Sequence, residues 1–178
     1  MTAGRAPSGR DIWKAVREEL LLNLYALPFF GSLRHDLEQN IALRTTVGAG
    51  AGVRIIDADA GSWDFDLGPA YISTLPISTE AGPVEREQDL GIVVNTHAKF
   101  DIAKDVTVSA SWMSAFTVTG VSRSYHHGTA VLDFELTSVF SLDLSLVFDR
   151  IEQATTTEDG RVPAQNELQI VIGLGVKF

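Results

Sequence analysis

The sequence predicts an all-β protein, an antiparallel up-and-down transmembrane β-barrel of about eight strands with a short N-terminal helix or tail. Apolar and polar residues alternate with a period of two in segment after segment, as they do in strands with two different faces. The connections alternate between short and long, as in outer-membrane barrels. The sequence holds no apolar run of about 18 residues, so a membrane crossing would have to use a closed barrel. We expect a tail or helix over residues 1–20 and the barrel over 21–178.

Composition narrows the classes of protein. The chain has 178 residues, a formal net charge of −9 and no cysteine. Lys and Arg are scattered, which argues against nucleic acid and against an anionic membrane surface as partners. Without cysteine, disulfides and thiolate metal sites are excluded. We expect no cofactor and no metal.

The N-terminal region has a different pattern. Apolar residues between 11 and 22 lie near helical spacing, which favours a short amphipathic helix at the periplasmic rim or a tail leading into the first strand. Glu18, Glu19, Asn23 and Pro28 interrupt the apolar stretch, and no small-residue cleavage site follows. We therefore interpret this region as something other than a signal peptide.

Eight strands are expected from the period-two segments. Their ranges are 25–34, 43–55, 63–71, 92–101, 106–112, 130–136, 142–149 and 168–178. The last is the most regular, and its lipid-facing stripe is Leu168, Ile170, Ile172, Leu174, Val176 and Phe178. Ten residue steps of about 3.3 Å, tilted by about 40°, span roughly 25 Å, the height of the apolar band on such barrels.

The connections predict which way the barrel points. The links at 57–62, 103–105 and 137–141 are short, whereas those at 78–88 and 153–165 are long and that at 118–124 is intermediate. Outer-membrane barrels have short periplasmic turns and longer extracellular loops. We therefore expect a periplasmic C-terminus.

The polar face is expected to point inward. Glycines at 48, 50, 52, 173 and 175 all lie on it, where small residues make room for larger side chains across a narrow lumen. Aromatic residues gather on the apolar face near strand ends, as in interfacial girdles. Unpaired buried charges are costly, so the inward charges should form one network that plugs the lumen. Its members are Arg44, Arg54, Asp64, Asp66, His97, Lys99, Asp133, Glu135, Asp143 and Asp149.

The catalytic candidates lie at the start of a strand. His127, Thr129 and Asp133 share one face, so an oriented base beside a hydroxyl is conceivable, with His126 as a neighbour. A polar strand end at the wet interface explains the same residues more simply. His126 and His127 point to opposite faces of a strand, which argues against one metal held by both.

Several short motifs recur in a known order. They are Leu43–Gly52 (LRTTVGAGAG), Leu67–Tyr71 (LGPAY), Leu142–Leu146 (LDLSL), the Asp149–Arg150 pair and the closing Val176–Phe178 (VKF), preceded by a strand over Tyr25–Asp36. Over roughly residues 24–178 the chain resembles the family of salt-induced outer-membrane proteins (domain of unknown function 481). The resemblance implies an outer-membrane barrel of unassigned activity, linked by name to salt stress. Members of that family carry further hairpins before the matching region.

The sequence leads to three functional hypotheses. The first is a non-enzymatic barrel of the bacterial outer membrane with a structural or envelope-stress role, surrounded by lipid and lipopolysaccharide. The terminal aromatic resembles the signal that barrel-assembly machinery reads, so we expect that machinery as a partner. The second is a barrel enzyme that hydrolyses acyl chains of lipid A through His127 or His126. The third is a soluble, lipocalin-like binder of an apolar ligand.

Overall fold

The structure, a computed structural model, describes residues 24–80, 82–118, 124–152 and 154–176. They form eight strands: β1 (Leu24–Asp36), β2 (Ile41–Ala58), β3 (Gly61–Pro76), β4 (Glu87–Ala103), β5 (Val106–Thr117), β6 (Tyr125–Glu135), β7 (Phe140–Ile151) and β8 (Asn166–Val176). The tail or helix expected over residues 1–20, and Phe178 at the other end, lie outside the described residues. Within them, no helix is long and apolar enough to cross a membrane.

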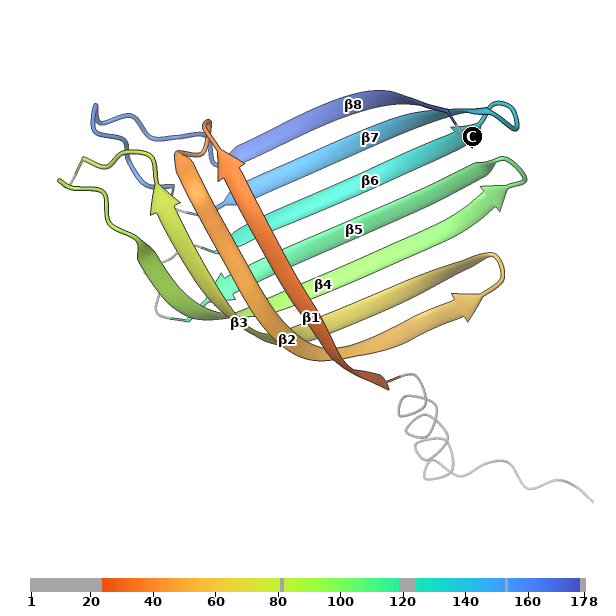
Figure 1. Ribbon diagram of the computed structural model, residues 1–178, viewed down its shortest axis with the longest axis horizontal. Helices are drawn as coiled ribbons and strands as arrows, with labels where there is room; N and C mark the ends of the chain where they lie inside the picture. Colours follow the sequence, from red (N-terminus) through yellow and green to blue (C-terminus); the bar gives the residue numbers. More distant parts are fainter. Residues whose placement is uncertain (1–23, 81, 119–123, 153, 177–178) are drawn as a thin grey trace, which may run out of the picture.

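Every strand pairs antiparallel with the strand that follows it, so the sheet order is β1 to β8. The sheet curls into a half-barrel in which β1 to β3 roll over in front of the middle strands (Figure 1). The all-β, up-and-down arrangement of eight strands predicted from the sequence is confirmed. The described sheet is not closed into a ring, because β1 and β8 are its two edges.

The strands extend beyond the predicted segments. β6 begins at Tyr125 rather than at residue 130, and β4 begins at Glu87 rather than at residue 92. Tyr125 pairs with Ile151 and Glu87 with Thr74, so the backbone ladder continues where the regular apolar alternation has stopped. Hydrogen bonding between backbones does not require the alternation that sequence reasoning relies on.

The two ends of the half-barrel differ. At one end, the turn end, lie the links over residues 59–60, 104–105 and 136–139. At the other, the loop end, lie the described parts of the links over 77–86, 118–124 and 152–165, together with the turn over 37–40. Asn40 ties three of the connections at the loop end together: its amide nitrogen donates to Ser78 O at 2.8 Å and to Thr155 O at 3.1 Å. The loop end is therefore a joined structure rather than a set of separate loops.

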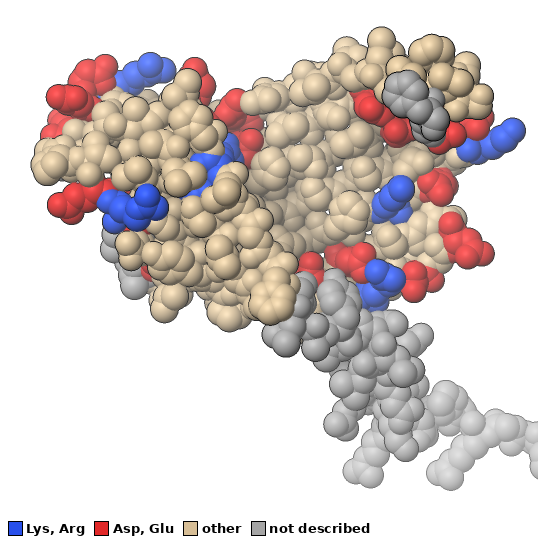
Figure 2. Space-filling view, viewed as in Figure 1, with Lys and Arg blue, Asp and Glu red and all other residues tan. Residues whose placement is uncertain are grey.

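The two faces of the sheet differ in the way the alternation predicts. Large apolar side chains are exposed on the convex face, for example Leu146 at 43% and Ile172 at 71%. The concave face carries the polar set, and Arg44 on it is only 2% exposed. Charged side chains gather toward the two ends of the strands, with a broad uncharged region between them (Figure 2).

Close contact between β2 and β3 accompanies the curl of the sheet. A Cβ placed on Gly50 would lie 2.1 Å from the backbone oxygen of Leu67, and one on Gly68 would lie 2.5 Å from the Cα of Gly50. Only glycine lets two backbones approach this closely. The missing side chain of Gly48 leaves space for the ring of Phe30, the residue paired with it on β1, rather than for a side chain across the lumen.

A small apolar cluster lies inside the curl. It comprises Ala70, Ile72, Val93, Ala115 and Tyr125, each at most 4% exposed. The cluster lies on the concave face toward the loop end, so that end of the hollow is filled with side chains. One of its members, Tyr125, also lines the candidate site.

Candidate functional site

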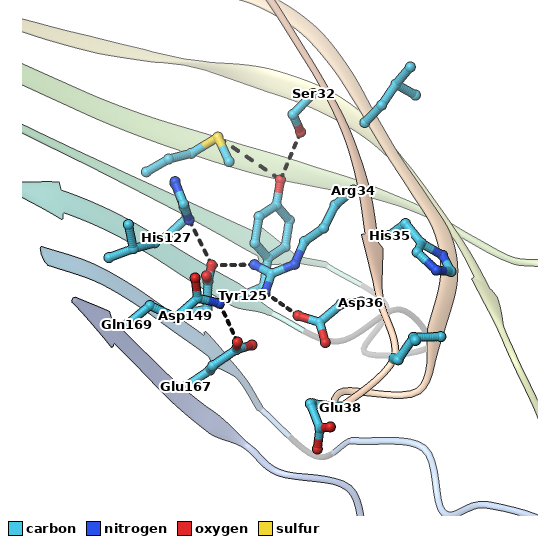
Figure 3. Close-up of a pocket in the computed structure, with 14 residues that line it drawn as sticks. Ser32, Arg34, His35, Asp36, Glu38, Tyr125, His127, Asp149, Glu167 and Gln169 are labelled. Carbon is cyan, nitrogen blue, oxygen red and sulfur yellow. Dashed lines mark hydrogen bonds and ion pairs between the residues drawn. The ribbon is translucent and has the colours of Figure 1, made fainter. Parts of the chain in front are cut away.

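A cavity of about 590 Å³ opens on the concave side at the loop end. Its walls come from β1 on one side and from β5 to β8 on the other (Figure 3). It is the place where residues far apart in the chain bring charged groups together.

Asp149 is the centre of the charged cluster. Its carboxylate contacts the Arg34 guanidinium of β1, and its Oδ1 lies 2.7 Å from Nδ1 of His127. The Asp149 side chain is 8% exposed and that of Arg34 is 19% exposed. A charge so far removed from water needs partners, and Asp149 has a cation and an imidazole (Figure 3).

The end of β1 positions Arg34. A register shift between Arg34 and Asp36 interrupts the ladder with β2 there. Asp36 accepts a hydrogen bond from Arg34 Nη2 at 2.6 Å and another from the backbone N–H of Gln39 at 2.9 Å. Asp36 thus links the turn after β1 to the guanidinium and holds it toward Asp149.

Tyr125 bridges the hollow beside this cluster. Its hydroxyl lies 2.8 Å from Thr46 Oγ1 on β2 and 3.4 Å from Ser32 Oγ on β1. The Arg44 guanidinium carbon lies 4.7 Å from the ring centre, and Arg44 Nε donates to Thr74 Oγ1 at 3.0 Å. A tyrosine of β6 is thereby joined to three residues of β1 and β2 across the concave face.

The structure separates the predicted catalytic residues. The carboxylate beside His127 is Asp149 of β7, not Asp133. Thr129 Oγ1 lies 2.6 Å from Ser111 Oγ, so its hydroxyl is engaged with β5. Thr129 and Asp133 are four residues apart on β6, roughly 13 Å, so the three side chains cannot form one hydrogen-bonded catalytic line.

His126 lies on the opposite face from His127, as the strand geometry predicts. Its Nδ1 lies 2.9 Å from Ser114 Oγ, and its ring meets that of Phe116 edge-on with centres 5.7 Å apart. The two histidines therefore cannot hold one metal together. Among the described residues there is no group of three or more candidate ligands.

Of the ten residues predicted to plug the lumen, eight lie toward the turn end and two toward the loop end. Arg54 Nε and Asp64 Oδ1 form a separate pair at 2.8 Å toward the turn end. Arg44 and Asp149 belong to the loop end, in the neighbourhood of Tyr125. The other six also lie toward the turn end of their strands: Asp66, His97, Lys99, Asp133, Glu135 and Asp143.

Arg34 and Tyr125 are among the site residues that were absent from the sequence-based candidates. Arg34 lies in the least regular strand, where alternation assigns faces poorly. Tyr125 stands two residues before His127 and shares its face, so extending the period-two pattern backwards would have placed a hydroxyl-bearing aromatic ring on the polar side. Contacts between distant strands cannot be read from that pattern.

The cluster has limited chemical capability on its own. The carboxylate of Asp149 orients the imidazole of His127, which is the arrangement of a general base and its orienting group. The other ring nitrogen of His127 points away from Asp149 (Figure 3). A reaction would need a water or a hydroxyl at that nitrogen.

The fold and the site define a class of protein: an up-and-down antiparallel half-barrel with an apolar convex face and a polar, partly filled concave face. The family profile described as "Protein of unknown function, DUF481" matches residues 23–178. The chain belongs to this family, which confirms the resemblance of its motifs to domain of unknown function 481. Comparisons with curated proteins and with solved structures gave no match.

Proposed function

We propose that the protein is a β-barrel of the bacterial outer membrane that crosses the lipid with its eight strands. The exposed apolar stripe on the convex face carries this proposal. On β8 the outward residues Leu168, Ile170, Ile172 and Leu174 are between 63% and 78% exposed. Contiguous apolar surface of this extent is rare on soluble monomers and marks contact with lipid or protein.

The distribution of polar residues supports lipid rather than water outside. A soluble barrel turns its apolar side chains inward. Here Arg44, Thr46 and Asp149 are buried on the concave side, whereas Leu144 and Leu146 of β7 are each more than 40% exposed on the convex side. This polarity is the opposite of that expected for a lipocalin-like binder.

Strand length and aromatic placement agree with a membrane crossing. β7 and β8 have 12 and 11 residues, enough for a tilted strand to cross an apolar band of about 25 Å. Trp63 and Tyr71 lie exposed toward opposite ends of β3. Their amphipathic rings suit the two membrane interfaces.

The proposed orientation puts the turn end in the periplasm and the loop end outside, near lipopolysaccharide. The joined loops and the bridging Tyr125 narrow the outer mouth. A narrowed mouth supports a structural or envelope-stress role, including the salt stress that the motif resemblance implies, rather than a pore. The barrel-assembly machinery would insert the chain.

Localisation and detergent dependence test the proposal. We expect the full chain to fractionate with outer membranes, to need detergent for extraction, and to migrate differently on gels before and after boiling. Reconstituted protein should give no steady ion conductance. Recovery as a monodisperse monomer in buffer without detergent would overturn the proposal.

A second candidate function is hydrolysis of a lipid acyl ester, favoured by the pairing of His127 with Asp149. The imidazole would take a proton from water as the oxygen attacks the ester carbonyl, and return it to the departing alkoxide. We expect a His127→Gln variant to fold but to release no acyl chain from lipid A. Unchanged lipid A in cells that express or lack the native protein would exclude this activity.

A further inference from the structure

The described sheet has two free edges, β1 and β8, which approach each other at one end only. They converge at the loop end and splay toward the turn end (Figure 1). We infer that β1 and β8 of one chain pair directly and close an eight-stranded barrel. The inference deepens the proposed function, because backbone groups at an open edge could not be satisfied in lipid.

Contacts at the loop end already bring the two edges together. Arg34 of β1 reaches Asp149 of β7, the strand next to β8. The turn after β1 contacts the loop before β8, since Asn40 Nδ2 donates to Thr155 O. The cavity between them has Ser32 and Arg34 on one wall and Glu167 and Gln169 on the other. These contacts hold the two edges of the sheet close to each other at the loop end.

The width of the hollow also fits eight strands. Tyr125 of β6 and Thr46 of β2 are hydrogen-bonded at 2.8 Å, although three strands separate them in the sheet. In a ring of eight, strands in these positions face each other across the lumen. Such a lumen is just wide enough for side chains to fill it, and barrel diameter grows with strand number. A barrel with several more strands would pull this pair apart.

One register matches the side chains on both faces of the seam. Paired residues in a sheet point to the same face, so inward residues of β1 must oppose inward residues of β8. Placing Arg34 opposite Glu167 brings opposite charges together, and this register sets no two like charges opposite each other. The other inward pairs are then Ser32 with Gln169 and Phe30 with Val171, and the outward pairs are Leu33 with Leu168, Gly31 with Ile170 and Phe29 with Ile172.

A shift by two residues in one direction sets Asp36 against Glu167, and the opposite shift separates Arg34 from Glu167 and sets it against Gln165. The favoured register also closes the ring geometrically. When the seven observed registers are extended past the ends of their ladders and followed from Arg34 across the sheet and the seam, the hydrogen-bonding direction returns to β1 eight residues along the chain. A stagger of that size over eight strands gives a tilt of about 35°, which is within the usual range for barrels.

Cysteine pairs test the seam directly, because the chain has no cysteine of its own. In detergent-extracted protein we expect Leu33→Cys with Leu168→Cys to form an intramolecular disulfide that shifts the mobility on a non-reducing gel. Opposed residues in a sheet have Cα atoms about 4.5–5.5 Å apart, within disulfide reach. The variant pair Leu33→Cys with Ile170→Cys, displaced by two residues, should react far less.

The variant pair Leu146→Cys with Ile170→Cys, from observed neighbours in β7 and β8, is the positive control. A disulfide-linked dimer from the seam pair would overturn the inference and place a second copy of the chain at the edges. Absence of any seam disulfide, with the positive control oxidised, would also overturn it. These outcomes are separate from the test of membrane localisation. If the protein is found in the membrane and is heat-modifiable but its seam cysteines do not react, the closure of the barrel is refuted and the proposed function is not.

Discussion

Substituting Leu146 by lysine measures which solvent faces the convex side. Leu146 lies in the middle of β7, 43% exposed, between Ala130 of β6 and Ile170 of β8. If lipid covers it, a lysine near the bilayer midplane should cost about 2–4 kcal/mol of folding free energy. That corresponds to roughly a 30- to 700-fold smaller folding equilibrium constant.

The assay is reversible unfolding by denaturant in phospholipid vesicles, followed by tryptophan fluorescence. Ser145→Lys is the matched control, because the neighbouring residue points into the hollow and should tolerate the charge with a much smaller loss. In water, replacing an exposed leucine typically changes stability by less than about 0.5 kcal/mol. An effect of Leu146→Lys that small, or one no larger than that of the control, would refute the reasoning that lipid covers this face.

Three other substitutions test the internal packing. Tyr125→Phe removes the hydroxyl bonded to Thr46, which is 1% exposed, and should lower the unfolding free energy in micelles by about 1–3 kcal/mol, with Tyr71→Phe as a control. Asn40→Gly keeps the left-handed backbone of Asn40 (φ 59°) but loses its bonds to Ser78 and Thr155, so the loops should become more sensitive to proteolysis than in the native protein. Gly50→Ala should reduce the folded yield, since its Cβ would lie 2.1 Å from a backbone oxygen, whereas Gly173→Ala should be tolerated because its nearest neighbour would lie at 3.6 Å. Equal yields of the two alanine variants would contradict the close-approach argument.

Period-two alternation was sufficient to predict the number, order and faces of the strands. It succeeds in β7 and β8 because every second residue is a large apolar one, from Leu142 to Phe148 in β7 and from Leu168 to Leu174 in β8. It places ends poorly, as at Tyr125, because ladder hydrogen bonds form between polar residues as well. It also carries no information on curvature, which depends on contacts such as that between Gly50 and Gly68.

For the candidate site, the sequence predicts the face on which some of the residues lie but not the contacts between them. The inward face of His127 and of Asp149 follows from alternation within each strand. Their mutual contact requires the register of β6 against β7, and the contact with Arg34 requires the sheet to curl until β1 meets β7. Asp133, the carboxylate chosen from the sequence, is on the right face but six residues along the same strand from His127. Residues that far apart on one strand are about 20 Å apart, too far for a hydrogen bond.

Charged side chains are more exposed to water at the turn end of the concave side than at the loop end. This difference argues for a lumen closed at one mouth. At the loop end the charges are removed from water and neutralised by contact, as with Asp149 between Arg34 and His127. At the turn end Arg54 is 45% exposed although it pairs with Asp64, so water shares in solvating it. Buried charge is tolerated only with partners, whereas hydrated charge needs none. Under the proposed orientation, water from the periplasm would enter the wide end and stop at Tyr125, so side-chain modification from the periplasmic side should reach Arg54 and spare Arg44.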